Sequence, residues 1–140
     1  MIRVSEAQQE AIRRHGARTF PHECVGVILG DVQDGVKVAQ ELRPLENVHE
    51  EGHERRYLVS PDQMLMLMQE ERRTRRKVLG FYHSHPNHPA RPSDYDRDWA
   101  WPWYSYIIVS VMDGVPADMT AWQLEEDRQS FRREEIEGCE

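Results

Sequence analysis

The pattern of apolar and polar residues in the first third of the chain predicts one helix followed by two strands. The segment Ser5–Gln8 fits a helix-capping box, and the helix that it opens should run to about Arg14, just before a glycine. Val25–Gly30 is rich in β-branched residues and bounded by glycine, as expected for a strand. An Asp-Gly pair at 34–35 separates it from the apolar Val36–Ala39, which predicts an antiparallel hairpin.

The middle of the chain predicts a loop, a short strand and a second helix. Residues 44–56 are polar and lack periodicity, and Tyr57–Val59 reads as a short strand. Ser60–Gln63 is a second capping box with proline at the first helical position, opening a helix to about Arg76. The apolar residues of this helix are expected to form one face that packs on a sheet, with a partner protein's groove as the alternative: Met64, Leu65, Leu67 and Met68.

The last part of the chain predicts further strands. Val78–Tyr82 is apolar and β-prone, which indicates a central strand leading directly into His83. Residues 104–112 form another candidate strand, 119–124 an edge strand, and 130–136 either an edge strand or a helix. From Glu125 onward seven acids face three arginines, so we expect a solvated, partly frayed end.

Composition and charge narrow the class of protein. The 140 residues carry 18 Lys and Arg against 25 Asp and Glu, a net charge of −7, which fits one domain and argues against nucleic-acid binding. Two distant cysteines give no disulfide framework. No apolar run approaches the roughly 18 residues of a membrane helix, and the N-terminus lacks the apolar region of a signal peptide. We expect a cytoplasmic monomer or homodimer that binds neither membrane nor nucleic acid.

The segment after the predicted central strand carries candidate metal ligands. His83 and His85 are two residues apart at the end of a strand, so their imidazoles project from the same face and can converge on one ion. Asp96 can return to them after a proline-rich turn. Two histidines and a carboxylate with one open position form the pattern of a catalytic zinc site.

Several alternatives remain open for these residues. Asp96 also completes a capping box with Ser93, and it can serve as a helix cap alone. His83 and His85 alone could be a polar pair without a metal. Three other residues are rival ligands: His88, Asp94 and Asp98.

A site that activates water also needs a general base. Glu23, which precedes the first apolar strand, is the candidate, although spacing alone does not place it beside His83 and it could be a surface residue. The neighbouring Cys24 raises another possibility, a zinc thiol sensor or a cysteine nucleophile.

These residues together reproduce a known signature. Glu23, then His83-Ser-His85, seven residues, Ser93, two residues and Asp96 resemble the JAMM (MPN-plus) metalloprotease motif. The wider chain also resembles the small prokaryotic stand-alone members of this family. The resemblance implies an α+β fold, the MPN fold, with a curved mixed β-sheet flanked by helices and an architecture related to cytidine deaminases. It covers residues 1–125 as one catalytic domain, while the acidic extension 126–140 is either part of the same domain or frayed.

The resemblance also implies a role for each residue of the motif. His83, His85 and Asp96 would hold one zinc ion. Glu23 would act on the zinc-bound water as general base and then acid, and Ser93 would stabilise the tetrahedral intermediate. Ser84, between the ligands, would orient the site from outside the ligand shell.

Relatives of this type hydrolyse the bond after the C-terminal Gly-Gly of a ubiquitin-like or sulfur-carrier protein, so the resemblance implies a peptidase or isopeptidase with such a partner. Trp99 and Trp101, with Trp103, are expected to pack in the core or as a hydrophobic shelf under the site, with contact to the substrate or to a second copy as the alternative. A non-catalytic MPN scaffold with a structural zinc is the alternative function. The basic residues at the end of the second helix form a solvated helix end or, alternatively, a docking patch: Arg72, Arg73, Arg75, Arg76 and Lys77.

Overall fold

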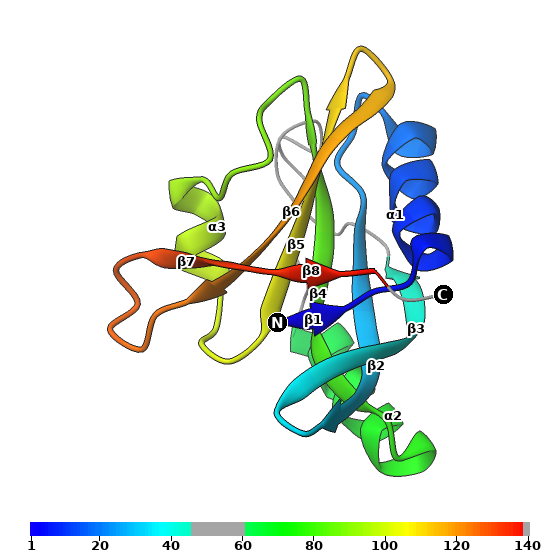
Figure 1. Cartoon of the computed structure of the whole chain (residues 1–140), viewed down its shortest axis with the longest axis vertical. Helices are drawn as coiled ribbons and strands as arrows, with labels where there is room; N and C mark the ends of the chain where they lie inside the picture. Colours follow the sequence, from blue (N-terminus) through cyan, green and yellow to red (C-terminus); the bar gives the residue numbers. More distant parts are fainter. Residues whose placement is uncertain (46–60, 139–140) are drawn as a thin grey trace.

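The structure, a computed structural model, describes residues 1–45 and 61–138. Its helices in that part of the chain are α1 (Glu6–Thr19), α2 (Pro61–Thr74) and α3 (Asp94–Trp99). The strands are β1 (Ile2–Arg3), β2 (Val25–Gln33), β3 (Val36–Leu45), β4 (Lys77–Pro86), β5 (Ser105–Met112), β6 (Val115–Leu124), β7 (Phe131–Glu134) and β8 (Ile136–Glu137). They form one sheet in the order β7-β6-β5-β4-β2-β3-β1-β8 (Figure 1).

The sheet is mixed and strongly curved. β2 pairs antiparallel with both β3 and β4, whereas β4 and β5 run parallel. β7 and β8 pair at opposite edges of the sheet, with β6 and β1, although only Glu135 separates them in the chain. The two edges must therefore lie close together, and Figure 1 shows β7 and β8 crossing the front as one nearly continuous segment. The predicted α+β class with a curved mixed sheet and flanking helices is confirmed.

Both faces of the central strands are buried. The whole of β4 from Val78 to Pro86 is buried, and successive side chains enter different cores. Tyr82 packs in a cluster with Ile12 of α1, while Phe81 packs in a second cluster with Leu67 of α2. Coverage by helices on both faces explains why this strand reads as a continuous apolar run.

The N-terminal helix is longer than its sequence pattern predicts. The Ser5 capping box is present, but the helix continues through Gly16 to Thr19. A Cβ at Gly16 would lie 3.0 Å from Cγ2 of Val111 and 3.3 Å from Cβ of Ser84. This glycine therefore serves close packing of α1 on the sheet and does not end the helix.

The predicted hairpin is confirmed. Asp34 and Gly35, at φ values of 52° and 78°, join β2 to β3, as a two-residue turn requires. The strand predicted over 119–124 is internal, because β6 pairs with both β5 and β7. Tyr57–Val59 and Ser60 lie outside the described residues.

Helix α2 buries only part of the predicted apolar face. Leu67 is buried and Met64 packs on the same core, but Leu65 and Met68 are 55% and 54% exposed. Met64 and Leu67 are three residues apart and share one stripe, whereas the other two lie about 100° around the helix. The prediction that all four residues pack on the sheet is therefore confirmed for Met64 and Leu67 and wrong for Leu65 and Met68.

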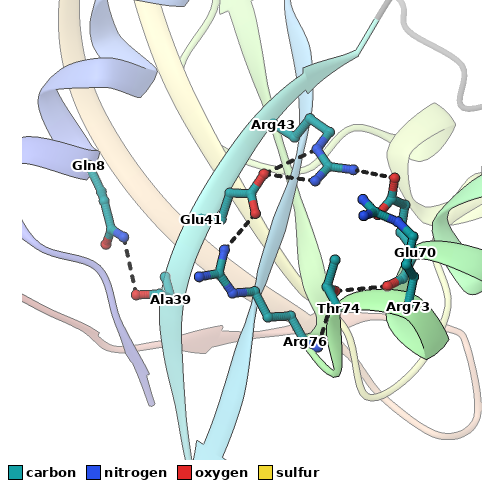
Figure 2. A network of polar contacts seen from close by, with 8 residues as sticks. All are labelled: Gln8, Ala39, Glu41, Arg43, Glu70, Arg73, Thr74 and Arg76. Atoms are coloured by element: carbon teal, nitrogen blue, oxygen red, sulfur yellow. Dashed lines mark hydrogen bonds and ion pairs between the residues drawn. The ribbon is translucent and has the colours of Figure 1, made fainter.

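Ion pairs fasten α2 to the sheet (Figure 2). Arg43 on β3 donates to Glu41 at 2.8 Å and lies 3.4 Å from Glu70 of α2. Arg76, which follows the helix, donates to the other oxygen of Glu41 at 2.6 Å. Arg73 also pairs with Glu70, so two residues of the predicted basic cluster are engaged in ion pairs within the protein.

A buried polar cluster ties the C-terminal segment to the sheet. Lys37 of β3 donates from Nζ to Ser105 Oγ at 2.9 Å and to the Trp103 carbonyl oxygen. Ser105 Oγ in turn donates to Glu134 Oε1 of β7 at 2.6 Å. Burial lowers the pKa of Lys37 to about 8, although the charge of Glu134 acts in the opposite direction. Residues 131–137 are therefore paired strands with a buried acid, in place of the expected frayed end.

Candidate metal centre

Three of the predicted ligands meet in one buried group. His83 and His85 project from the same face of β4, and Asp96 lies in the first turn of α3. The two Nε2 atoms are 3.1 Å apart. Asp96 places Oδ1 3.3 Å from His83 Nε2 and Oδ2 3.1 Å from His85 Nε2.

These distances fit a tetrahedral metal ion. Zinc binds histidine nitrogen at about 2.0–2.1 Å, so neighbouring ligand atoms of a tetrahedral site lie about 3.3 Å apart. His83, His85 and Asp96 supply two nitrogen donors and one oxygen donor within 4.8 Å of one another. The donor set and its spacing therefore suit Zn²⁺, with one position left for water or substrate.

The rival ligands lie outside this group. Asp94 and Asp98 have side chains that are 95% and 67% exposed, on the outer part of α3. His88 is also exposed. Within the described residues, the only group of three or more side chains able to hold a metal is that of His83, His85 and Asp96.

Asp96 is a helix cap as well as a member of the metal group. Ser93 Oγ accepts from the Asp96 backbone N–H at 3.1 Å, while Asp96 Oδ2 accepts from the Ser93 N–H at 2.9 Å. The capping box and the ligand role therefore coexist. The reciprocal bonds fix the carboxylate and place Ser93 at the same corner of the site.

Hydrogen bonding and burial favour the protonation states in which these three residues can bind a cation. The Pro89 carbonyl can only accept, so His85 donates to it from Nδ1 at 2.9 Å and keeps the Nε2 lone pair toward the other ligands. Burial lowers the pKa of His83, whereas the charge of Asp96 acts to raise it. The lowered pKa favours the neutral imidazole, which is the form that binds metal. Burial alone would raise the pKa of Asp96, but the two imidazoles outweigh it and hold the carboxyl well below its usual range.

The backbone next to Glu23 runs beside the strand that carries the two histidines, as the hydrogen bonds of its neighbour Cys24 show. Val25 pairs with His83 in the antiparallel ladder, so the residues before β2 run alongside the ligand-bearing end of β4. Cys24 N–H donates to Ser84 Oγ at 2.8 Å, and Ser84 N–H donates to the Cys24 carbonyl at 3.3 Å. Glu23 itself is only 4% exposed. The structure therefore places Glu23, as a buried residue, on the segment that runs alongside the ligand-bearing end of β4, which spacing alone did not specify.

Cys24 has the wrong environment for a nucleophile. Its side chain is buried, and burial raises the pKa of the thiol to about 11. A thiol with this pKa stays protonated at neutral pH, whereas nucleophilic and metal-binding cysteines act as thiolates. This counts against both thiol hypotheses.

The tryptophans near the site are largely exposed. Trp99, Trp101 and Trp103 expose 55%, 57% and 45% of their surface, so packing in the core is wrong for all three. Trp99 lies on the helix that carries Asp96 and contacts Tyr95, with ring centroids 6.0 Å apart.

Sequence reasoning missed the support behind the ligand strand. His15 of α1 is buried, and its Nδ1 lies 2.7 Å from the hydroxyl of Tyr82, the residue before His83. The position of His15 three residues after the buried Ile12 is a weak helical signal. Pro89 acts through its backbone carbonyl, which leaves no side-chain signal.

Comparison with known proteins identifies the family. Residues 5–125 match the family described as prokaryotic homologs of the JAB domain. The chain belongs to this family. The JAMM (MPN-plus) signature in the sequence is thereby confirmed, and with the His83, His85 and Asp96 group the chain is a JAMM-type metallopeptidase.

Two relatives carry functional names. The chain is 33% identical over 99 residues to the desampylase of Haloferax volcanii, covering 70% of this chain and 69% of that one. It is 34% identical over 117 residues to a probable TtuB-protein conjugate cleaving protease of Thermus thermophilus, covering 84% and 74%.

The fold is similar to that of a solved MPN protein. The crystal structure of a JAB1/MPN domain protein from Archaeoglobus fulgidus superposes with a TM-score of 0.63 at 21% identity, covering 99% of this chain and 98% of the other. This likeness confirms the MPN fold. No helix among the described residues is both long and apolar enough to span a membrane.

Proposed function

We propose that this chain is a zinc-dependent peptidase or isopeptidase that hydrolyses the bond after the C-terminal Gly-Gly of a ubiquitin-like or sulfur-carrier protein. The observation that carries the proposal is the convergence of His83, His85 and Asp96 beside a buried Glu23. The names of the Haloferax and Thermus relatives, one of them a conjugate-cleaving protease, support a protein conjugate as substrate.

His83 and His85, through Nε2, and Asp96, through its carboxylate, would hold one zinc ion per chain. When bound, zinc polarises the scissile carbonyl and lowers the pKa of water. Glu23 accepts a proton from the attacking water on a carboxylate oxygen and then passes it to the leaving nitrogen. Ser93 donates its hydroxyl to the oxyanion that develops on the carbonyl.

The remaining candidate residues position the catalytic groups or contact the substrate. Ser84 holds the Cys24 backbone and so sets Glu23 relative to the ligands. Trp99 and Trp101 offer exposed apolar surface at and after the C-terminus of α3, the helix whose first turn carries Asp96, suited to contact with a substrate chain. A glycine-glycine tail has no side chains, so it can approach the buried ligands where other sequences would clash.

The test compares zinc-loaded wild type with Glu23→Gln on a small carrier protein ending in Gly-Gly-X and on a carrier joined to a lysine side chain. We expect wild type to cleave and the variant to lose activity by about 100-fold or more. Zinc content and the circular dichroism spectrum should not change. Glu126→Gln, an exposed acid on the C-terminal segment, is the matched control.

The alternative function, a non-catalytic MPN scaffold with a structural zinc, gives a different result. A scaffold would show no zinc-dependent cleavage in wild type, and Glu23→Gln would leave partner binding intact. Cleavage that survives in Glu23→Gln but disappears in Cys24→Ala would instead indicate a thiol mechanism.

A further inference from the structure

A pocket apart from the metal group lies next to the loop that joins β4 to α3. Its volume is about 490 Å³, and its walls come from that loop, from β6 and from Arg133 on β7. None of the residues assigned above to metal binding or catalysis lines it.

The pocket opens on the same face of the sheet as the metal group. His83 on β4 pairs with Ile108 on β5, which pairs with Thr120 on β6. Side chains of laterally paired residues point to the same face, so Thr120 and Trp122, both pocket residues, share the face of His83.

The loop between the pocket and the metal group is held from both sides. On the metal side, His85 donates to the Pro89 carbonyl at 2.9 Å. On the pocket side, Thr120 Oγ1 donates to the Ala90 carbonyl at 2.6 Å. Pro89 and Ala90 also line the pocket, so one short segment borders both sites.

The charged groups of the pocket favour an anion. Arg91 and Arg133 face a single acid, Asp118, although the chain as a whole carries −7. The Arg133 guanidinium lies 5.4 Å from the centre of the Trp122 ring, whose Nε1 donates to Thr120 at 2.7 Å. Neither arginine forms an ion pair with a carboxylate in residues 1–45 and 61–138. Two guanidinium groups beside an aromatic wall suit a carboxylate with a short apolar stem.

We propose that this pocket binds a glutamate or aspartate side chain of the polypeptide substrate, close to the scissile bond, and so selects acidic sequences for cleavage. The assignment of the ligand as substrate rests on the proposed function, whereas the carboxylate preference of the pocket does not.

Binding is measured first, on zinc-loaded Glu23→Gln protein, by following the indole N–H resonance of Trp122 in ¹⁵N-labelled samples. The probes are capped peptides that contain Gly-Gly, with one glutamate either before or after it, and the matching glutamine peptides. We expect the better-placed glutamate peptide to shift the Trp122 signal and to bind about fivefold tighter than its glutamine counterpart. The glutamate position that binds tighter identifies the side of the scissile bond.

Variants then test the charges individually. Arg91→Gln and Arg133→Gln should each remove most of the glutamate preference, while Asp118→Asn should increase it. Arg132→Gln is the matched control, since this neighbouring arginine pairs with Glu125 and lies outside the pocket. Equal binding of glutamate and glutamine peptides, or an equal effect of Arg132→Gln, would overturn the proposal.

Cleavage by wild type separates this proposal from the proposed function. A higher kcat/KM for glutamate substrates that is lost in Arg133→Gln supports both. Glutamate-selective binding without cleavage of any Gly-Gly substrate contradicts the proposed function and leaves the pocket assignment standing. Cleavage of Gly-Gly substrates with no glutamate preference contradicts the pocket assignment and leaves the proposed function standing.

Discussion

Ser84 Oγ accepts a hydrogen bond from the Cys24 N–H at 2.8 Å, and the Ser84 N–H donates back to the Cys24 carbonyl at 3.3 Å. Ser84 lies between the two candidate histidine ligands, and Cys24 directly follows Glu23. This pair of bonds therefore links the candidate base to the strand of the candidate ligands through two residues to which the proposed reaction assigns no step.

Ser84→Ala should separate positioning from metal binding. The substitution leaves a buried Cys24 N–H without its acceptor, which costs about 1–3 kcal/mol of unfolding free energy. Loss of such a supporting group lowers activity about 10- to 100-fold. We expect kcat to fall while zinc content stays at one per chain, measured by steady-state kinetics and metal analysis. Ser130→Ala, in an exposed turn, is the control, and an unchanged kcat in Ser84→Ala would contradict the positioning role.

Gly16→Ala should destabilise the protein although alanine favours helices. An added Cβ would lie 3.0 Å from Val111 and 3.3 Å from Ser84, which pushes α1 away from the ligand strand. Relief of the glycine penalty offers about 1 kcal/mol, whereas overpacking a core costs about 1–3 kcal/mol. Urea denaturation of Gly16→Ala measures the balance, and Ala11→Gly on the exposed side of α1 calibrates helix propensity. A gain in stability equal to the loss in Ala11→Gly would refute the packing argument.

Lys37 should give the protein a distinctive stability profile at alkaline pH. Its pKa is lowered from 10.5 to about 8 on folding, so the unfolded chain binds more protons between these values. The free energy of unfolding therefore rises with pH across this window, and the penalty of the buried charge is complete below pH 8. The full effect is about 3 kcal/mol.

Chemical denaturation at several pH values from 7 to 10 measures this effect as the difference between wild type and Lys37→Met. The difference should grow in favour of wild type as pH rises through this range. Lys77→Met, at the exposed start of β4, should run parallel to wild type. Parallel curves for Lys37→Met would show that the lysine titrates normally.

Arg76→Gln should loosen the attachment of α2 to β3. Arg76 bonds to Glu41 at 2.6 Å, at a partly exposed position, so the expected loss is about 0.2–1 kcal/mol and decreases in high salt (Figure 2). Thermal unfolding at low and high ionic strength measures it. Arg72→Gln, at an exposed arginine of α2, should have no effect. Equal losses of stability in the two variants would mean that the change in net charge, and not the pair with Glu41, causes the effect.

The sequence was sufficient to predict features that depend on contacts between neighbouring residues. The Ser5 capping box and the Asp34-Gly35 turn involve neighbouring residues, so the sequence contains both partners. The metal group was also predictable, because His83 and His85 share a strand face and the motif fixes the spacing to Asp96.

Long-range contacts account for what could not be predicted. Gly16 reads as a helix end until the packing of α1 on Val111 is known. Leu65 on α2 and Trp99 on α3 are exposed because of the side that each helix turns toward the sheet. The sequence of the helix alone does not determine which side this is. The bond from His85 to the Pro89 carbonyl uses a backbone atom, which every residue possesses.

The one-residue link between β7 and β8 has a consequence for biosynthesis. β1 is made before the other strands of the described residues, and it pairs with β8, the last of them. The ligand-bearing segment from β4 to α3 is thus made and can dock well before the sheet closes. Closure depends on the contact of longest sequence separation, which is the slow class of folding event. A nascent chain should therefore acquire its metal group early and its full resistance to proteolysis only after residue 137 has emerged.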